Sequence, residues 1–547
     1  MTPTHSNAFR LRTLACAVLI AVCGHARAEP EPEAQQAPPQ GLPEPEMQAP
    51  SQTNFTLTAV TFVGNTRVTD YALQALAANQ IGRDITLADL EKIAERATAL
   101  YRDRGYFLAQ AVVPVQEVEQ GRVTINIVEG TLGQVDIQVD PDARIPAKRV
   151  ERTLKAALQP GQALNGRRYE NAMLLLSDLP GIRPKSSVES GAAIGTTDLN
   201  VEVSRGEPVG VVVEVDNHGT PESGRIRAGG TVRWASPTGH GDNLDLRVMV
   251  AEDAHTAFGR LAYEFPVGYQ GLRLGAGIAR VQYELGGAFR ILGATGTADI
   301  VDISASYPLI RQRSTNLFLR FGFDRKSLSD EFTSVEFESE KLVRGATAGW
   351  SFEHRDALLG GGYTSVNGVL YRGELDIRDP RSEFFDQLPL IGRKTQGYYT
   401  KLTVQATRLQ ALTKDLSLFF GAGIQHASRN LDSSEQLSLG GPRAVRAYST
   451  NEALVDEGWI TNLELRYAFS DRVTPFVFYD AAHGAVDRNR SPFIEKNGRS
   501  LRGYGIGLSW AKPGSWSLNA SLAWADGDRA VADRHDPRLY LQLQKHL

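Results

Sequence analysis

Leu244-Asp245-Leu246-Arg247-Val248-Met249-Val250 carries an aliphatic side chain at every second position, and the acidic pair Glu252-Asp253 follows it. Successive side chains of a β-strand point to opposite faces, so this stretch predicts a strand with one apolar face. Runs of this kind recur from Val209 to Leu547, with Gly, Asp, Asn and Pro between them. We expect about sixteen runs of roughly 9–12 residues, the length that a tilted strand needs to cross a membrane. The fold class predicted for residues 207–547 is an all-β transmembrane barrel of about 16 antiparallel strands.

A soluble β-sandwich or a β-propeller is the alternative for this part of the chain. The runs share no blade-like motif, and they continue to the last residue of the sequence. The mean hydropathy of the chain is only −0.26, and a low value is expected when alternate residues face a polar lumen. A closed barrel pairs its backbone groups between neighbouring strands, so it crosses a membrane without a long apolar helix. These considerations favour the barrel.

A long connection interrupts the barrel pattern at about residues 428–457, between the eleventh and twelfth runs. Ordinary hairpin loops have about 2–5 residues, so a connection of this length is expected to be either functional or disordered. At its centre lies Gly440-Gly441-Pro442-Arg443-Ala444-Val445-Arg446-Ala447-Tyr448, a glycine-led turn with a central arginine. We expect Arg446 to point back into the barrel and to hold the loop inside it. The run that follows the next turn carries Phe476-Val477-Phe478-Tyr479-Asp480.

Residues 53–206 show a different pattern, in which the order strand, helix, helix, strand, strand occurs twice. The helix expected at 87–101 has apolar residues at three- and four-residue intervals, which place them on one face, and Thr86 is expected to cap it. The first repeat covers 53–130 and the second covers 131–206, and each is long enough to bury a small two-layer core. The expected elements are 55–63, 70–78, 87–101, 109–115 and 122–129 in the first repeat, and 132–139, 146–158, 167–179, 182–189 and 197–204 in the second.

These α+β repeats resemble POTRA domains, the periplasmic modules of the BamA/TpsB superfamily of outer-membrane proteins. The resemblance rests on Phe62-Val63-Gly64-Asn65 and Val128-Glu129-Gly130 in the first repeat, and on Leu179-Pro180-Gly181-Ile182 in the second. In the long loop, Val445-Arg446-Ala447-Tyr448 is similar to the Val-Arg-Gly-Tyr/Phe signature in the sixth extracellular loop of that superfamily. The pair Phe478 and Asp480 resembles its Phe-x-Asp motif on the inner barrel wall.

The resemblance implies a contact inside the barrel, in which Arg446 reaches Asp480 and Phe478 lies beside them. A guanidinium is always charged and can meet a carboxylate through two parallel hydrogen bonds, which fix direction as well as distance. Ala447 stands where the family usually has glycine. If that position requires a positive φ, alanine strains the turn. Otherwise Ala447 is an acceptable small residue.

Together the repeats, the barrel and the loop resemble the TpsB transporters of two-partner secretion, of the haemolysin-activator or filamentous-haemagglutinin-transporter type. This resemblance implies that an unfolded exoprotein docks on the POTRA-like repeats and leaves through the barrel to the cell surface. An exposed strand edge offers unpaired backbone groups to such an extended client. The candidate edges are 109–115 and 182–189, and their candidate client-binding residues are Ala109, Ala111, Val113, Val115, Ile182 and Val188.

The expected location is the Gram-negative outer membrane, with the POTRA-like repeats in the periplasm. The expected partners are a large secreted exoprotein, outer-membrane lipid, and the periplasmic chaperones and barrel-assembly machinery that act during biogenesis. An outer-membrane assembly insertase of the BamA type is an alternative function, although such proteins generally carry more POTRA units. A passive porin-like channel and a surface adhesin are further alternatives. For a porin, the repeats and the loop motif are superfluous.

The N-terminus predicts export. Arg10 and Arg12 precede an apolar run at 14–22, and Ala26-Arg27-Ala28 supplies a cleavage site, so residues 1–28 are expected to be a signal peptide. Residues 29–52 are rich in Pro and Glu and predict an extended linker. The leader holds both cysteines, Cys16 and Cys23, so disulfides and thiolate metal sites are excluded from the exported chain. It also holds three of the 59 basic residues and none of the 63 acidic ones, so the exported chain has a net charge of about −7, which disfavours nucleic acid as a partner.

Neither an enzymatic site nor a bound cofactor or metal is expected. The histidines after residue 28 show no pair at metal-binding helical spacing, and the sequence holds no Gly-x-Ser-x-Gly elbow or phosphate loop. An acidic cluster at 526–536 lacks the ordered spacing of a known calcium loop, and a hairpin cap is the favoured interpretation. The sequence therefore predicts a transporter rather than an enzyme.

Overall fold

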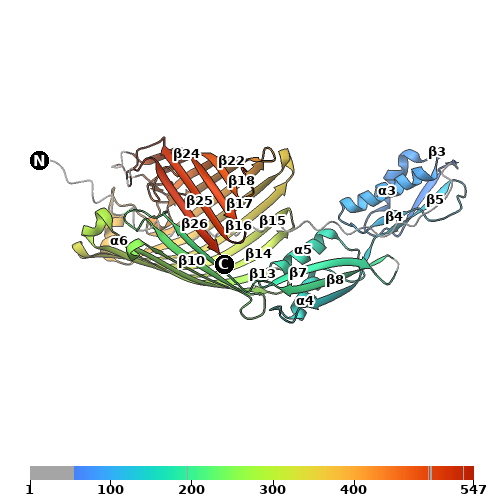
Figure 1. Cartoon of the computed structure of the whole chain (residues 1–547), viewed down its shortest axis with the longest axis horizontal. Coiled ribbons are helices and arrows are strands. Elements are labelled where there is room, and N and C mark those ends of the chain that lie inside the picture. The colour runs from blue at the N-terminus through green and yellow to red at the C-terminus, as the bar shows by residue number, and fades with distance from the viewer. Residues whose placement is uncertain (1–53, 194, 491, 493–495, 532, 534) are drawn as a thin grey trace.

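The computed structural model describes residues 54–193, 195–490, 492, 496–531, 533 and 535–547. Two small α/β units precede a β-barrel and lie at one end of it (Figure 1). The predicted signal peptide and linker, residues 1–52, lie outside the described residues. None of the helices in the described part of the chain is long and apolar enough to span a membrane.

Sixteen antiparallel strands of the described chain close into a barrel, in which the last strand, β26, pairs with the first, β9. Closure leaves these strands without a free sheet edge, as a membrane requires. The predicted fold class is therefore confirmed. The strands are β9 (Val209–Asp216), β10 (Arg227–Ala235), β11 (Asn243–Ala251), β12 (Thr256–Val267), β13 (Leu272–Glu284), β14 (Ala294–Arg311), β15 (Thr315–Phe332), β16 (Phe337–Asp356), β17 (Gly362–Ile377), β18 (Gly397–Ala411), β19 (Leu416–Ala427), β22 (Glu457–Tyr467), β23 (Val473–Ala485), β24 (Gly498–Lys512), β25 (Trp516–Ala525) and β26 (Arg538–His546). The barrel strands are connected by the helical turns η2 (Glu252–Ala254), η3 (Gly287–Leu292), η4 (Thr333–Val335) and η5 (Leu358–Gly360), and by the short helix α6 (Pro380–Gln387) between β17 and β18. A further helical turn, η1 (Ala78–Gln80), lies in the first N-terminal unit.

The two faces of the barrel wall differ as the alternation predicts. Leu246, Val248 and Val250 of β11 are 43–47% exposed, on the face that meets lipid in a membrane barrel. Arg247, between them, points inwards and pairs with Glu214 at 3.4 Å. Strands β14 to β18 have 15 to 20 residues, more than the predicted 9–12. At about 3.3 Å per residue and a tilt of about 45°, a strand of 20 residues rises roughly 45 Å, so it projects beyond a hydrocarbon core of about 30 Å.

The first N-terminal unit is a three-stranded sheet in the order β2–β5–β4, and two helices pack on it. The strand expected at 55–63 is divided, because β1 (Phe55–Thr56) pairs with β3 (Asp84–Ile85) instead of continuing into β2. The strand expected at 109–115 is shorter: Pro114 has no N–H, and the Ala111 N–H donates to Thr98 Oγ1 at 2.9 Å. The elements of this unit are β2 (Ala59–Val63), α2 (Asp70–Ala77), α3 (Leu87–Asp103), β4 (Gln110–Val112) and β5 (Arg122–Val128).

Helix α3 begins where the sequence predicts. Thr86 caps it, and the Thr86 and Asp89 side chains each accept a hydrogen bond from the other's backbone, which forms a capping box. Leu90, Ala94 and Tyr101 lie on the buried stripe that faces the sheet. The helix predicted from the three- and four-residue spacing of the apolar residues is therefore confirmed.

Glu129, directly after β5, connects the two stretches of the first unit that resemble POTRA domains, the end of β5 and the turn after β2. It accepts hydrogen bonds from the backbone N–H groups of Thr66 (2.6 Å) and Arg67 (2.7 Å) and from the Tyr101 hydroxyl (2.8 Å). Burial opposes ionisation of Glu129, but these hydrogen bonds outweigh it and lower its pKa. The turn after β2 is thus fixed to the end of β5.

The second N-terminal unit repeats this arrangement, with a sheet in the order β6–β8–β7. It packs directly on turns at the end of the barrel where both N-terminal units lie (Figure 1). Arg311, at the end of β14, holds the Asp178 carboxylate through two hydrogen bonds of 2.7 and 2.9 Å. The Ser236 hydroxyl, after β10, donates to the Arg144 carbonyl at 2.7 Å. The elements of this unit are β6 (Thr131–Val139), α4 (Ala147–Ala157), α5 (Gly166–Ser177), β7 (Ile182–Ser190) and β8 (Thr196–Arg205).

Candidate functional site

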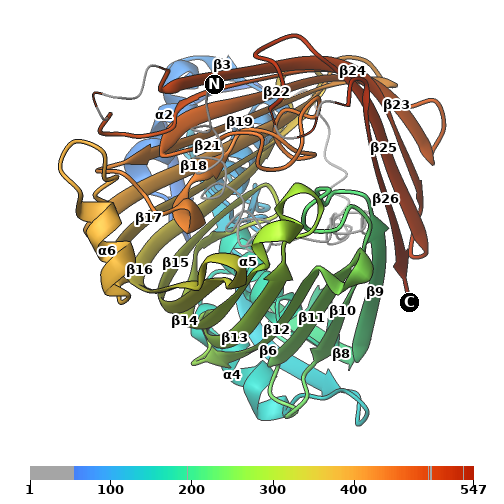
Figure 2. The ribbon, with the colours of Figure 1, turned by 90° about the vertical axis from the view of Figure 1, so that its left-hand side faces the viewer.

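The long loop between β19 and β22 folds inside the barrel rather than outside it. Figure 2, which looks into the barrel, shows the segment around β21 within the ring of strands. The loop contains the helical turn η6 (Ser433–Glu435) and a short ladder between β20 (Leu437–Ser438) and β21 (Leu454–Val455). It forms an apolar cluster with the inner faces of β23, β24 and β25. The buried members of this cluster are Leu439, Val445, Ala447, Tyr448, Ala453, Val455, Phe478, Ala482, Leu501 and Ala523.

Arg446 lies at the centre of the contact between the loop and the wall. Its Nη2 and Nε donate to the two carboxylate oxygens of Asp480 at 2.7 and 2.8 Å. Its Nη1 donates to Glu464 Oε1 at 2.6 Å, and its guanidinium carbon lies 3.5 Å from the centre of the Phe478 ring. Arg446 is only 7% exposed and Asp480 is fully buried. The structure therefore brings together the three residues that the family resemblance implied.

Glu464 is a partner of Arg446 that the sequence reasoning missed. It lies on β22 directly opposite Phe478 of β23 and also accepts from Arg466 at 2.7 Å. The signal was present in the sequence, because Glu464 stands between Leu463 and Leu465, which face outwards. A carboxylate at an inward position beside the predicted motif was the available clue.

Other groups hold the backbone of the loop motif. Asn462 Nδ2 donates to the Ala444 carbonyl and to Asp480, both at 2.8 Å. The Tyr448 hydroxyl donates to the Asp528 carbonyl at 2.8 Å, and the Tyr540 hydroxyl donates to the Tyr448 carbonyl at 2.8 Å. Strands β22 and β26 and the connection after β25 therefore all contribute to the position of this turn.

Ala447 fits its position without a glycine-like backbone. Its φ is not among the positive values of the described chain, so the strain considered from sequence does not arise. Gly503 of β24 makes the space for its methyl group, because a Cβ on Gly503 would lie 2.5 Å from the Ala447 Cβ. A glycine on the wall thus accommodates the alanine in the loop.

This pairing predicts a compensating substitution. Gly503→Ala is expected to destabilise the barrel by about 1–3 kcal/mol, because an added methyl overpacks this contact. Adding Ala447→Gly removes the nearest clash and is expected to recover most of that loss. The measurement is the temperature at which the purified barrel loses its folded migration in a detergent gel. Equal losses in the single and the double variant would contradict the assignment.

A second set of ion pairs holds the first part of the loop, near η6. Glu435 in η6 accepts from Lys326 of β15 at 2.7 Å and from Lys401 of β18 at 2.8 Å. Both ammonium groups lie over the Tyr371 ring, at 5.3 and 5.8 Å from its centre. Glu435 is only 3% exposed. We call Glu435, Lys326 and Lys401 the lysine clasp.

The lysine clasp was missed because it joins residues far apart in the sequence. Asp432 extends it by pairing with Lys341 of β16 at 2.9 Å. Lys326, Lys341 and Lys401 sit at positions that face the lumen, which is an available signal, but alternation does not tell which loop residue each one meets. The ion pairs of Asp432 and Glu435 therefore hold the loop on β15–β18, and those of Arg446 hold it on β22–β23.

Three of the candidate client-binding residues, Ala111, Ile182 and Val188, lie in edge strands, and the other three flank β4. Strands β4 and β7 each have one partner, β5 and β8 respectively, so both are edge strands. Ala109, Ala111, Val113 and Ile182 are buried in the cores of their units, Val188 is partly buried, and Val115 is 90% exposed. Of these side chains, only that of Val115 is largely exposed.

The acidic cluster near the C-terminus is engaged in ion pairs. Asp528 pairs with Lys496 at 3.0 Å and Asp533 with Arg538 at 3.2 Å. In the part of the chain that the structure describes, His, Cys, Asp and Glu side chains form no group of three or more that would hold a metal ion.

The fold and the site define a class of protein. A closed barrel with two POTRA-like units at one end and an arginine-held loop inside has the domain arrangement of the BamA/TpsB superfamily of outer-membrane proteins. Residues 195–510 match the family described as haemolysin secretion/activation protein ShlB/FhaC/HecB, and residues 55–130 match the POTRA domain of the ShlB type. The chain belongs to the ShlB/FhaC/HecB family.

Individual relatives agree with this assignment. The heme/hemopexin transporter protein HuxB of Haemophilus influenzae strain 86-028NP is 26% identical over 494 residues, 88% of this chain and 86% of HuxB. The outer membrane transporter CdiB of Escherichia coli O6:K15:H31 strain 536 is 22% identical over 430 residues, 76% of this chain and 69% of CdiB.

Solved structures show the same fold. CdiB from Escherichia coli superposes with a TM-score of 0.72 at 21% identity, over 92% of this chain and 93% of that one. BamA from Haemophilus ducreyi lacking POTRA domains 1–3 gives a TM-score of 0.51 at 15% identity, over 90% of this chain and 100% of that one. The protein is thus an outer-membrane TpsB-type transporter with its POTRA units in the periplasm, and its relatives are transporters rather than enzymes.

Proposed function

We propose that this transporter binds an unfolded exoprotein on its periplasmic POTRA units, 53–130 and 131–206, and exports it through the barrel, 207–547. The observation that carries the proposal is the loop inside the lumen, which is held by side-chain contacts at Arg446 and Glu435 rather than by the barrel sheet. Such contacts can be broken and remade, so the loop can leave the path of a client and return. Export needs no nucleotide in this mechanism, because folding of the client outside drives it.

Strand β7 is the better of the two candidate edges for a client. The Gly191 N–H donates to Thr196 and the Gly206 N–H donates to Gly181, so the odd-numbered residues of β7 face β8. The even-numbered residues, including Ile182 and Val188, turn their backbone groups outwards. Strand β4 has only three residues, and Thr98 accepts from the Ala111 N–H. We therefore assign the main docking edge of the proposed function to β7.

The proposed client is a large secreted exoprotein of the two-partner type. An assembly insertase is the second candidate, and the fold likeness to BamA is the observation that favours it. Depletion of the protein separates these functions. Selective loss of one large secreted protein supports the transporter, whereas general loss of outer-membrane proteins supports the insertase.

Deletion of residues 55–129 is expected to leave the barrel in the membrane but to stop secretion of the client. The barrel keeps its contact with the second unit, because Arg311 and Asp178 lie outside the deletion. Secreted client is measured in the medium, and the folded barrel is measured by its gel migration. Normal secretion by the deleted chain would contradict the docking role.

A matched control is needed because the deletion also removes contacts with the second unit, among them the packing of two apolar side chains. Phe107 and Leu108 pack against the core of that unit. The full-length variant with Phe107→Ala and Leu108→Ala loses only those contacts. It is expected to secrete the client, which would assign the defect of the deletion to the first unit itself.

A further inference from the structure

A cluster of arginines lies on the outer surface of the barrel. Arg325 of β15 stands directly opposite Arg344 of β16 in the strand register. Arg344 in turn stands opposite Glu374 of β17, and Arg372 lies two positions before Glu374 on the same face. The three arginines are exposed, and their strands lie side by side in the wall (Figure 2). We call Arg325, Arg344 and Arg372 the arginine patch.

Alternation along the strands shows that the arginine patch points out of the barrel. Phe321 and Phe323, at alternate positions before Arg325, are both exposed on the face that meets lipid. Lys326, the next residue, turns to the lumen as part of the lysine clasp. Residues that stand directly opposite each other on neighbouring strands share a face, so the rest of the patch points outwards as well.

The height of the patch matches the outer border of the hydrocarbon core. Arg344 stands twelve residues from Asp356, where β16 ends on the side of the POTRA units. Arg325 stands ten residues from Thr315, where β15 begins on that side. At about 3.3 Å per residue and a tilt of about 45°, these positions rise roughly 28 and 23 Å. The apolar band of a membrane barrel is about 25 Å tall, so the patch lies where the lipid headgroups begin.

The positive charges of the patch are only partly balanced. Arg344 pairs with Glu374 at 3.0 Å, and Arg372 donates to the Thr400 hydroxyl at 2.9 Å. Within the described residues, no hydrogen bond, ion pair or ring contact holds Arg325. Like charges that stand directly opposite each other destabilise a sheet. An anion between Arg325 and Arg344 would remove that repulsion.

Other carboxylates beside the patch already have cationic partners. Asp299 of β14 lies next to Arg325 on the outer face and pairs with Arg280 at 3.6 Å. Asp376 of β17 lies on the other side of the patch and pairs with Arg378 at 3.6 Å. The patch therefore keeps a net positive charge at the level of the headgroups.

We propose that the arginine patch binds a phosphate group of a lipid in the outer leaflet. This inference goes beyond the proposed function and does not depend on it. A guanidinium meets phosphate oxygens through two parallel hydrogen bonds. Facing side chains on neighbouring strands start only about 5 Å apart, so Arg325 and Arg344 can share one phosphate. Phe321 and Phe323 continue the site towards the membrane centre as an apolar surface for the acyl chains, so the occupant is a lipid rather than a free anion.

The patch lies behind the part of the wall that holds the loop inside the barrel. Lys326 of the lysine clasp follows Arg325 directly on β15. Tyr371, over which both ammonium groups of the clasp lie, directly precedes Arg372 on β17. A phosphate bound outside would therefore link strands whose inner faces hold Glu435 of the loop.

The test is native mass spectrometry of the purified full-length transporter, which shows the lipid molecules that stay bound. The probe is lipid A with its phosphates, and lipid A without phosphates is the comparison. Arg325→Gln is expected to weaken binding of the phosphorylated lipid about fivefold, and the double variant with Arg325→Gln and Arg372→Gln about twenty-fivefold. Arg372 is chosen because its loss leaves no carboxylate unpaired. Binding of the dephosphorylated lipid is expected to stay the same in all variants.

Arg502→Gln is the matched control. Arg502 of β24 is also exposed and lies on the outer face with Tyr504 and Ile506, but Ala481 stands opposite it instead of a second arginine. This variant is expected to bind the phosphorylated lipid like the unchanged protein. The folded migration of each variant in a detergent gel is checked, and substitutions on the outer surface are expected to preserve it.

The outcomes are distinct. Unchanged lipid binding in the double variant, or equal weakening by Arg502→Gln, would overturn the assignment. Equal binding of lipid A with and without phosphates would overturn it as well. Displacement of the lipid by inorganic phosphate at an equal concentration would assign the patch to a free anion instead. A dimer mass that Arg325→Gln converts to a monomer mass would assign the patch to an interface between two copies of the chain.

Discussion

Replacing Arg446 by alanine is expected to stop most secretion of the client while the barrel still inserts into the outer membrane. The substitution leaves the buried carboxylate of Asp480 without its two guanidinium hydrogen bonds and Glu464 without its shortest ion pair. Breaking one partner of a buried ion pair costs about 3–5 kcal/mol. That cost falls on the contact between the loop and the β22–β23 wall, so the loop loses its fixed position. The barrel strands keep their own pairing and are expected to assemble.

Secretion and barrel abundance are measured in the same cells, because the prediction concerns their ratio. Arg466→Ala is the matched control: Arg466 also donates to Glu464, at 2.7 Å, but from the open side of the site. This control leaves Arg446 and Asp480 in contact and is expected to secrete normally. Arg446→Lys keeps the charge without the two parallel hydrogen bonds and is expected to be intermediate. An unchanged ratio in Arg446→Ala would contradict the anchoring role.

The barrel was predictable because its strands share one pattern, an apolar side chain at every second position. Leu246, Val248 and Val250 face outwards as their spacing requires, and the same spacing recurs until the chain closes on itself. What alternation fixes is the face on which a side chain lies. It does not fix strand length, so the projecting ends of β14 to β18 were not expected.

The site was predictable only in part, for a related reason. Arg446, Phe478 and Asp480 came from a family motif, whereas Glu464 and the lysine clasp had no motif to indicate them. Lys326 and Glu435 lie more than a hundred residues apart and meet at 2.7 Å only because barrel closure brings β15 next to the folded loop. Such a contact across a lumen depends on the curvature of the whole wall. Local sequence patterns do not determine that curvature.

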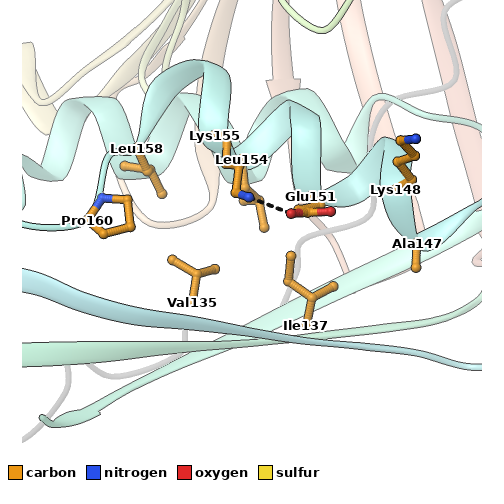
Figure 3. A pocket seen from close by; sticks show the side chains of 9 residues that line it. All are labelled: Val135, Ile137, Ala147, Lys148, Glu151, Leu154, Lys155, Leu158 and Pro160. Carbon is orange, nitrogen blue, oxygen red and sulfur yellow. Dashed lines mark hydrogen bonds and ion pairs between the residues drawn. The ribbon is translucent and has the colours of Figure 1, made fainter. Parts of the chain in front are cut away.

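The edges of the POTRA units show the same limit on a smaller scale. The sequence indicated two of the edge strands, β4 and β7, but not that Ala111 and Ile182 turn their side chains into the core. A groove between β6 and α4, lined by Val135 and Ile137 of β6 (Figure 3), was not indicated at all. It arises from the packing of α4 over Val135 and Ile137, and the spacing of apolar residues within each element does not determine that gap.

The double variant with Arg446→Ala and Glu435→Ala is expected to open the barrel to ions more than either single variant. Glu435→Ala leaves Lys326 and Lys401 side by side over Tyr371 with their shared carboxylate gone. Their mutual repulsion adds to the loss of a buried ion pair, which by itself costs about 3–5 kcal/mol. The lysine clasp holds the loop near η6 and Arg446 holds it at its centre, so each single variant releases one of these two points. The double variant loses both points of attachment, so the segment between them is expected to move most in that variant.

Single-channel conductance in planar bilayers measures this opening. Glu457→Ala is the matched control, because Glu457 pairs with Arg488 at 2.8 Å at the start of β22 and belongs to neither of these two points of attachment. It is expected to conduct like the unchanged protein. A double-variant conductance no larger than that of Arg446→Ala alone would mean that the lysine clasp holds nothing after Arg446 is lost. A larger conductance in the double variant would support two separate contacts. Adding Lys326→Met to Glu435→Ala removes the repulsion between the two lysines and is expected to lower the conductance again. Both results together would assign the closed state of the pore to the lysine clasp and to Arg446.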